Sequence, residues 1–319
     1  MTELIIDVSY KCNSSCKYCR WNITNHQKKE ITPPLDQLLL PKESIRSLNV
    51  SRIVLSGGEP ILADNLDEVI NYYKNFSLPI RLITNGIHLT SNNILRLSGL
   101  GIKEYVISLN TISYDLYSKL CEISKEDFEK IMLNLENISL IRQKDTSIVS
   151  YIGLNVVLTN LNCKWNIFKE LLKFAKENDF NQIKYQPVFD DGYLSKNAPE
   201  LSLKKDSIAY IDEIILNLNH YKFKSQFTNP IGFWQDLKQF LQGIELPTKN
   251  CAVGNNSILL HKGTLKFCFW CHHSSYGPLN QYYSPKDINK IRKKFNRKLD
   301  NCTILPQCFC LQPIDHIWS

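Results

Sequence analysis

Three cysteines near the N-terminus have the spacing of a metal-binding loop. Cys12, Cys16 and Cys19 follow the pattern C-x3-C-x2-C, and thiolates at such short range bind iron–sulfur clusters, zinc or copper(I). A structural zinc site takes four closed ligands; no fourth cysteine follows, although His26 could serve. A four-iron cluster held by three thiolates leaves one iron open to a small molecule. The spacing therefore favours a cluster over zinc, and both over a disulfide with a spare thiol.

A second motif that could do chemistry is Gly57-Gly58-Glu59-Pro60. Paired glycines let the backbone approach a ligand closely, with φ values that other residues avoid. Glu59 adds a carboxylate, and Pro60 stiffens the exit of the turn. Alone, the motif could be an ordinary turn with a solvated glutamate, but its position after a cysteine loop favours a ligand-binding turn.

Both motifs follow short apolar runs that we expect to be strands of a parallel sheet. The sequence alternates apolar runs with amphipathic stretches, which is the pattern of repeated βα units. Strands are expected at residues 4–8, 53–55, 80–83, 105–110, 151–158 and 183–188, and helices at 66–73, 124–141 and 166–177. Six units predict an α/β fold with a partial (βα)6 TIM-like barrel, because a closed eightfold barrel needs two more.

Polar residues follow the carboxyl ends of these strands. Thr84 and Asn85 come after the third strand, and Ser108 and Asn110 lie at the end of the fourth. Loops at this edge of a parallel α/β fold converge, and ligands bind there. One ligand could therefore contact the cysteine loop, the glycine pair and these four residues at once.

These motifs together resemble those of the radical S-adenosylmethionine (SAM) superfamily. Its signature is C-x3-C-x2-C with an aromatic residue before the last cysteine, and residues 57–60 match its GGEP motif. The resemblance implies that Cys12, Cys16 and Cys19 hold a 4Fe–4S cluster whose open iron chelates the amino and carboxylate groups of SAM. An electron from a flavodoxin- or ferredoxin-type reductant, passed through the cluster, would cleave SAM to methionine and a 5′-deoxyadenosyl radical.

The same resemblance implies which residues contact SAM. Glu59 and the neighbouring backbone of Gly57 and Gly58 would contact the methionyl amino group, and Tyr18 would lie beside the adenine. The other implied SAM contacts are Thr84, Asn85, Ser108 and Asn110. Read without the resemblance, Ser108 or Asn110 could equally be a hydrogen-bonded strand end.

A second group of cysteines lies near the C-terminus, at positions 251, 268, 271, 302, 308 and 310. Residues 257–260 and 264–267 flank a turn with Gly263, which predicts a β-hairpin. By ligand type, four of these thiolates could bind zinc or a cluster equally well. The pattern C-x11-G-x4-C resembles the opening of the SPASM and twitch extensions of the superfamily, which carry auxiliary clusters.

This resemblance implies one auxiliary 4Fe–4S cluster of the twitch type, because six thiols cannot fill two four-cysteine sites. The expected ligands are Cys251, Cys268, Cys308 and Cys310. Cys302 is the alternative ligand. If Cys271 or Cys302 is free, it could instead donate a hydrogen atom to a substrate radical.

Three segments are expected along the chain. Residues 1–195 would form the radical SAM core, residues 196–245 a helical linker or cap, and residues 246–319 the auxiliary-cluster region. Within the linker, residues 206–218 and 233–241 have the pattern of helices. Hydrophobic residues make up 43% of the 319 residues, which is enough for a substantial core.

Composition restricts the setting and the partners. No secretory signal and no apolar run as long as a membrane span, about 18 residues, is found, so we expect a cytoplasmic protein without membrane contact. The formal net charge of +7 leaves out the negative charge of bound clusters. The basic run at 290–298 has helical periodicity, which favours a solvated helix face over a nucleic-acid groove.

Three functions remain, of which the first is favoured. Relatives with such extensions mainly crosslink, oxidise or epimerise ribosomally made peptides, and this implies a peptide-modifying enzyme. The alternative is the oxidation or rearrangement of a small molecule in antibiotic, sugar or cofactor biosynthesis. The third, a non-catalytic iron–sulfur or zinc protein, does not explain a three-cysteine open site followed by Glu59.

Overall fold

The computed structural model describes residues 2–19, 32–188, 193–221, 227–244, 257–266 and 275–278, with single residues at 286, 287, 290 and 293. His26 and all six cysteines from Cys251 to Cys310 lie outside these residues. The predictions that concern them therefore stay predictions.

A single sheet organises the described residues, in the order β6-β5-β4-β3-β2-β1-β7-β8-β9. Its first six strands are β1 (Thr2–Ser9), β2 (Val50–Gly57), β3 (Ile80–Thr84), β4 (Ile102–Ser108), β5 (Tyr151–Leu158) and β6 (Gln182–Pro187). Each pairs in parallel with its neighbour in sequence. The six predicted strands and the partial-barrel fold are confirmed.

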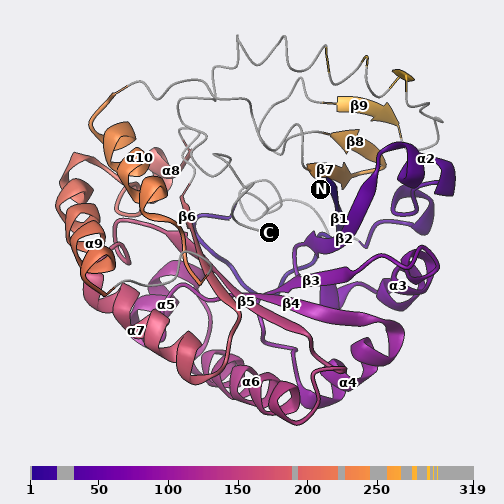
Figure 1. Cartoon of the computed structure of the whole chain (residues 1–319), viewed down its shortest axis with the longest axis horizontal. Helices are drawn as coiled ribbons and strands as arrows, with labels where there is room; N and C mark the ends of the chain where they lie inside the picture. The colour runs from indigo at the N-terminus through magenta and orange to yellow at the C-terminus, as the bar shows by residue number, and fades with distance from the viewer. Residues whose placement is uncertain are drawn as a thin grey trace.

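Helices follow the strands along the outer side of the curved sheet (Figure 1). They are α2 (Lys42–Ser47), α3 (Leu66–Lys74), α4 (Ser91–Leu100), α5 (Tyr114–Cys121), α6 (Lys125–Lys144) and α7 (Trp165–Glu177), with short 3-10 helices η1 (Leu35–Gln37) and η2 (Pro60–Leu62). The helices predicted at 66–73, 124–141 and 166–177 correspond to α3, α6 and α7. The sequence analysis did not identify α2, α4 and α5.

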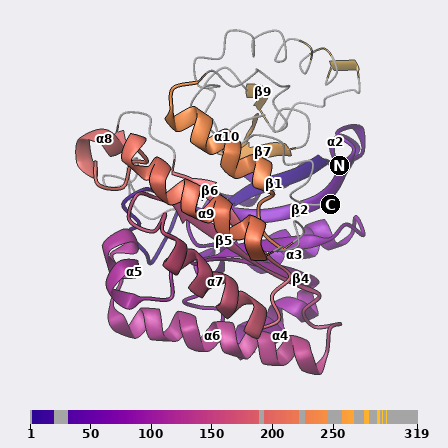
Figure 2. The ribbon, with the colours of Figure 1, turned by 60° about the vertical axis from the view of Figure 1, so that its left-hand side comes forward.

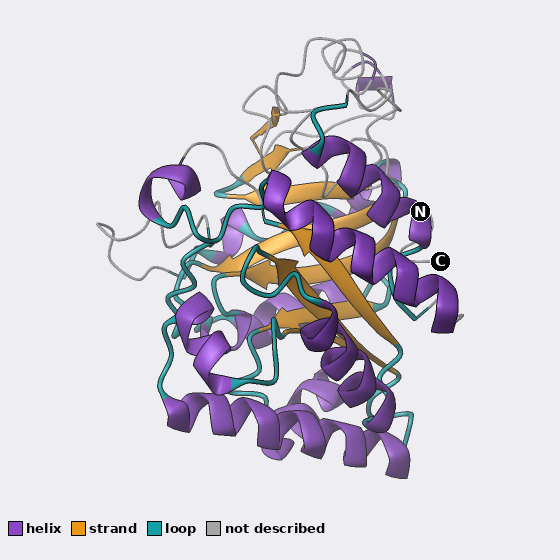
Figure 3. Ribbon diagram, turned by 90° about the vertical axis from the view of Figure 1, so that its left-hand side faces the viewer, coloured by secondary structure: helices purple, strands orange, loops and turns teal. Residues whose placement is uncertain are grey.

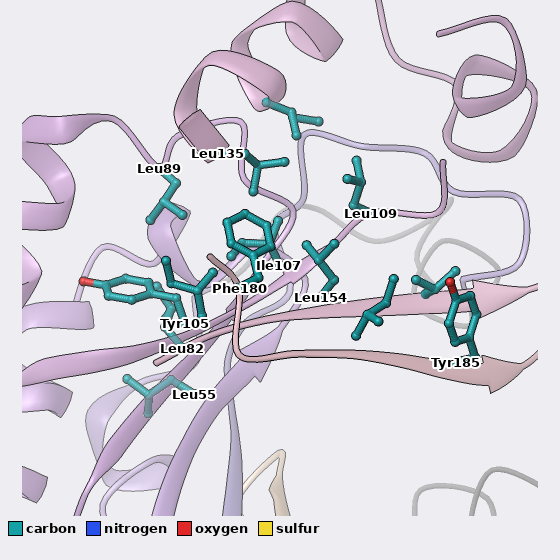
Figure 4. Packing of buried hydrophobic residues seen from close by; sticks show 14 of the residues in the cluster. Leu55, Leu82, Leu89, Tyr105, Ile107, Leu109, Leu135, Leu154, Phe180 and Tyr185 are labelled. Carbon is teal, nitrogen blue, oxygen red and sulfur yellow. The ribbon is translucent and has the colours of Figure 1, made fainter. Parts of the chain in front are cut away.

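The main core lies between the outer face of the sheet and these helices. Leu55 of β2 is paired with Leu82 of β3, and Ile107 of β4 with Leu154 of β5. All four are buried, and Figure 4 shows Ile107 close to Leu135 of α6, with Leu82 and Leu55 farther away along the sheet. Because side chains alternate along a strand, the residues between them point to the inner face of the sheet.

The linker region is helical, as its pattern predicts. It contains α8 (Tyr193–Asn197), η3 (Lys205–Ser207), α9 (Ile208–Tyr221) and α10 (Ile231–Leu241). Helix α9 packs against α7 and α10, and Figures 2 and 3 show α9 and α10 side by side. None of the helices described is long and apolar enough to cross a bilayer.

The predicted hairpin is present and extends the core sheet. Strand β7 (Ser257–His261) pairs antiparallel with β8 (Thr264–Lys266), which pairs with β9 (Ser275–Pro278). Gly263 occupies the turn with a φ of +64°, where glycine is favoured. The pairing that was not predicted is that of β7 with β1, which is parallel. It joins a C-terminal strand to the strand that precedes the cysteine loop.

Candidate active site

The cysteine loop leaves the carboxyl end of β1 and is held by the end of α5. The backbone N–H of Ser15 donates to the carbonyl of Cys121 at 3.2 Å, and that of Lys17 to Leu120 at 2.9 Å. The last carbonyls of a helix have no partner within the helix. Helix α5 thus uses these groups to fix the middle of the loop.

The three predicted cluster ligands lie on this loop. Cys12 is exposed, Cys16 and Cys19 are partly buried, and none of them forms a disulfide. The N–H of Cys19 donates to the carbonyl of Cys16 at 3.0 Å, which closes a turn between these two ligands. Among the described residues, no three His, Cys, Asp or Glu side chains form a site for one metal ion. A cubane cluster binds each thiolate through a different iron, so three separate thiols on one loop fit a cluster better than zinc.

The glycine pair lies against the start of the cysteine loop. The N–H of Gly58 donates to the carbonyl of Ser9, and that of Glu59 to the carbonyl of Lys11, both at 2.7 Å. A Cβ at Gly57 would lie 2.3 Å from the Ser9 oxygen, and one at Gly58 2.1 Å from the Lys11 oxygen. The sequence predicted a close approach to a ligand. In the structure the close approach is to the backbone of the loop that would hold the ligand.

Glu59 is fully buried beneath these loops. Its Oε1 accepts hydrogen bonds from Thr84 Oγ1 at 2.7 Å and from the N–H of Ile61 at 3.3 Å, and its Oε2 accepts one from the N–H of Asn85 at 2.7 Å. Burial raises the pKa of Glu59 to about 7, although these hydrogen bonds oppose the shift. A carboxylate destabilised in this way would gain from a cationic group placed nearby.

The raised pKa predicts a pH-dependent stability. Because the folded state holds the proton more tightly, the contribution of Glu59 is fully present below the ordinary glutamate pKa and is lost as pH rises through about 7. In the wild type, titration of Glu59 should lower the unfolding free energy by up to about 3 kcal/mol between about pH 4 and about pH 8. Glu59→Gln should abolish this decrease. Urea unfolding of the wild type and the variant at both pH values measures the decrease. An equal decrease in the two proteins would contradict a raised pKa for Glu59.

Asn85 connects the β3 loop to the cysteine loop. Its Nδ2 donates to Asn13 Oδ1 at 2.8 Å and lies 4.0 Å from Cys12 Sγ. Its Oδ1 accepts from the N–H of Ile87 at 3.0 Å. The structure therefore brings Thr84, Asn85 and Glu59 together beside the first cysteine, as the convergence of strand ends predicts.

Asn134, which the sequence analysis did not identify, supports the same loop. It is a buried residue of α6, and its Nδ2 donates to the carbonyls of Gly86 and Ile87 at 2.9 and 3.0 Å. A polar residue on the apolar face of a predicted helix is the signal that could have revealed it.

We expect Asn134→Ala to destabilise the protein, because it removes a donor from two buried carbonyls, of which that of Gly86 keeps the Leu89 N–H. The expected loss of unfolding free energy is about 2 kcal/mol. Asn137→Ala, at a partly buried position of the same helix, is the matched control and should change stability by less than about 0.5 kcal/mol. Thermal unfolding measures both, and equal shifts in the two variants would argue against a role for Asn134 in holding the loop.

Tyr18 and Asn110 also meet at the cysteine loop. Asn110 Nδ2 donates to Tyr18 Oη and lies 3.5 Å from Cys121 Sγ, and Asn110 Oδ1 accepts from the N–H of Val157 at 2.8 Å. Both the nitrogen and the oxygen of the Asn110 amide thus form hydrogen bonds, and they link β4 to β5 and to the cysteine loop. Ser108 is the last residue of β4, and its carbonyl accepts a hydrogen bond from Tyr117 Oη at 3.3 Å.

Two further residues of this network were not identified from the sequence. Cys121 is buried and lies 3.4 Å from Tyr18 Oη. The side chain of Asn162 donates to the carbonyls of Asn110 and Val157, and accepts from Thr159 N and Oγ1. Asn162 thereby ties the ends of β4 and β5 together behind Asn110.

The opposite end of the inner face is closed by ion pairs. Arg52 contacts Glu3 at 2.8 Å and Glu104 at 3.2 Å, and Arg81 contacts Glu104 at 2.7 Å. The Arg81 guanidinium also lies 4.5 Å from the centre of the Tyr151 ring. These charges are partly to fully buried near the amino ends of the strands, whereas the cysteine loop is at the carboxyl ends. A ligand is therefore expected to bind at the carboxyl edge of the sheet.

Comparison with known proteins identifies the family to which this fold belongs. The profile of the radical SAM superfamily matches residues 6–158. The GTP 3′,8-cyclase of Clostridium perfringens strain 13 is 32% identical over 313 residues, which cover 91% of this chain and 88% of that protein. A probable GTP 3′,8-cyclase of Methanococcus aeolicus is 31% identical over 305 residues, covering 90% and 92%.

Solved structures share the fold at lower identity. SuiB of Streptococcus suis bound to S-adenosylmethionine has a TM-score of 0.64 and 16% identity, with 96% of this chain and 71% of that chain covered. Native anSMEcpe with bound AdoMet has a TM-score of 0.63 and 18% identity, covering 97% and 89%. With relatives above 30% identity along nearly its whole length, this chain belongs to the radical SAM superfamily.

Proposed function

We propose that this radical SAM enzyme acts on a small molecule, and that a purine nucleotide is the first candidate. The observation that carries this proposal is the identity of about a third, over about nine-tenths of the chain, to GTP 3′,8-cyclases. These relatives favour the small-molecule alternative over the peptide substrate that the cysteine pattern favoured. The peptide reading has weaker support, since the SuiB and anSMEcpe structures share only the fold.

The residues of the site fit the group that the superfamily uses. Cys12, Cys16 and Cys19 would hold a 4Fe–4S cluster, which together with SAM supplies a 5′-deoxyadenosyl radical. Glu59 would receive the methionyl ammonium group, because its burial leaves its negative charge uncompensated. Asn85, between Glu59 and Cys12, would orient the same end of SAM.

The remaining roles are part of the proposal. Gly57 and Gly58 position the cysteine loop. The residues proposed to border SAM farther from Glu59 are Tyr18, Thr84, Ser108 and Asn110. Cys251, Cys268, Cys308 and Cys310 would hold one auxiliary cluster in a twitch-like region, with Cys302 as the alternative ligand. A free Cys271 would serve as a hydrogen donor.

Anaerobic reconstitution tests the proposal. With dithionite and SAM, we expect about four irons per chain for the first cluster and about eight if the auxiliary cluster is present. GTP should increase 5′-deoxyadenosine formation and be converted to a new product, both detected by mass spectrometry. A short cysteine-containing peptide is the parallel arm. Product from the peptide and none from GTP would reverse the preference, and no 5′-deoxyadenosine in either arm would contradict radical SAM activity.

A further inference from the structure

An aspartate and a histidine meet where the core sheet joins the C-terminal hairpin. Asp7 lies on β1 and His261 ends β7, and Asp7 Oδ2 is 3.1 Å from His261 Nδ1. The strand register explains the contact. Ile5 is paired with Leu259, so the residues two positions farther along each strand come side by side on the same face. The pair could not be found from the sequence, because 254 residues separate its members.

The two side chains lie on the inner face, at the same edge as the cysteine loop. Leu4, Ile6 and Val8 of β1 belong to the outer core, so the intervening Asp7 points inward, as Glu3 does at the other end of the strand. Asp7 precedes Cys12 by only a few residues. The pair is therefore near the proposed active site, on the side where β7 pairs with β1.

Holding the strands together does not explain this pair. Asp7 is 1% exposed, and its Oδ1 has no hydrogen-bond partner among the described residues. Burial raises its pKa, while the hydrogen bond and charge of His261 oppose the shift. Backbone pairing from Glu3 to Ile6 already joins β1 to β7. Two apolar side chains would serve that purpose without the cost of burying a carboxylate.

Hydrogen bonding to a carboxylate fixes a histidine as the tautomer with its proton on Nδ1, which leaves a lone pair on Nε2. We propose that His261, oriented by Asp7, accepts a proton from the substrate on the inner face of the sheet, a role that rests on the proposed function. The proton leaves an O–H, N–H or C–H bond whose electron pair stays on the substrate. The imidazolium that forms is balanced by the Asp7 carboxylate.

The surroundings of His261 suit this role. The ring of Tyr10 meets the imidazole edge-on, with centroids 5.6 Å apart, and Tyr10 Oη accepts from the N–H of Lys262 at 3.1 Å. The charge of Lys266 also acts on Asp7. The His261 side chain is 13% exposed.

Carbethoxylation tests the orientation without requiring turnover. Diethyl pyrocarbonate attacks the unprotonated imidazole nitrogen, and peptide mass spectrometry of the reconstituted enzyme identifies His261 among the seven histidines. We expect His261 to be modified, SAM with GTP to protect it, and Asp7→Asn to slow the modification by on the order of tenfold, because the tautomer is no longer fixed. An unreactive His261, or equal rates with and without Asp7, would overturn the proposal.

Turnover tests the proton transfer itself. His261→Gln should retain iron and form 5′-deoxyadenosine, while product per 5′-deoxyadenosine falls by about a hundredfold. Added imidazole should restore product to His261→Gly, which a merely structural role would not allow. His220→Gln, at an exposed position of α9, is the control. An unchanged product ratio would overturn the proposal. If the wild type shows no GTP-dependent 5′-deoxyadenosine, the proposed substrate fails and carbethoxylation alone decides the role of His261.

Discussion

Cys16→Ala is expected to abolish 5′-deoxyadenosine formation, lowering its rate by about a thousandfold or more, equivalent to about 4 kcal/mol of barrier. Cys16 is the central thiol of the loop, and its neighbours Ser15 and Lys17 are both anchored to the end of α5. Without this thiolate, two ligands remain, and a cubane cluster does not assemble stably on two thiolates. Iron content and visible absorbance after anaerobic reconstitution should therefore fall together with activity.

Cys163→Ala is the matched control, because it also removes a buried thiol. Cys163 is fully buried among apolar residues between β5 and α7. Its loss should lower stability modestly and leave iron content and SAM cleavage near those of the wild type. Full iron content in Cys16→Ala, or an equal loss in both variants, would show that Cys16 is not a cluster ligand.

Gly58→Ala is expected to have the second largest effect, although it adds only one methyl group. The new Cβ would lie 2.1 Å from the carbonyl oxygen and 2.8 Å from the carbonyl carbon of Lys11. Both atoms are backbone, so relief requires that the cysteine loop itself move. The movement would also break the hydrogen bond from Glu59 N to Lys11 O, and overpacking of this kind costs about 1–3 kcal/mol.

The expected result for Gly58→Ala is a folded protein with reduced stability, low iron content and a loss of SAM cleavage of about a hundredfold. Gly99→Ala is the control, because a Cβ at Gly99 has no atom within 4 Å and the residue lies in α4. Alanine in a helix should stabilise the protein by up to about 1 kcal/mol and leave activity unchanged. A Gly58→Ala enzyme with normal iron content and activity would refute the close approach as the reason for this glycine.

Local sequence signals were sufficient for the six strands β1 to β6 and for helices α3, α6, α7, α9 and α10. A buried parallel strand needs a run of apolar residues, so 4–8, 53–55 and 151–158 were recognisable within β1, β2 and β5. Helix α6 carried both a regular apolar face and a cap, since Ser124 Oγ accepts from the N–H of Asp127 at 3.1 Å. Helix α4 begins with Ser91-Asn92-Asn93 and contains Gly99, residues of low helix propensity, and α5 has only eight residues, too few to show a clear period.

The sequence by itself determined the chemistry of the cysteine loop and the edge of the sheet where that loop lies. Thiol spacing and strand polarity are both local properties of a chain. Only the tertiary structure decided that Gly58 contacts Lys11, that the end of α5 holds the loop, and that Asp7 meets His261. These contacts depend on how distant segments are placed by packing and strand register, and no spacing along the chain encodes them.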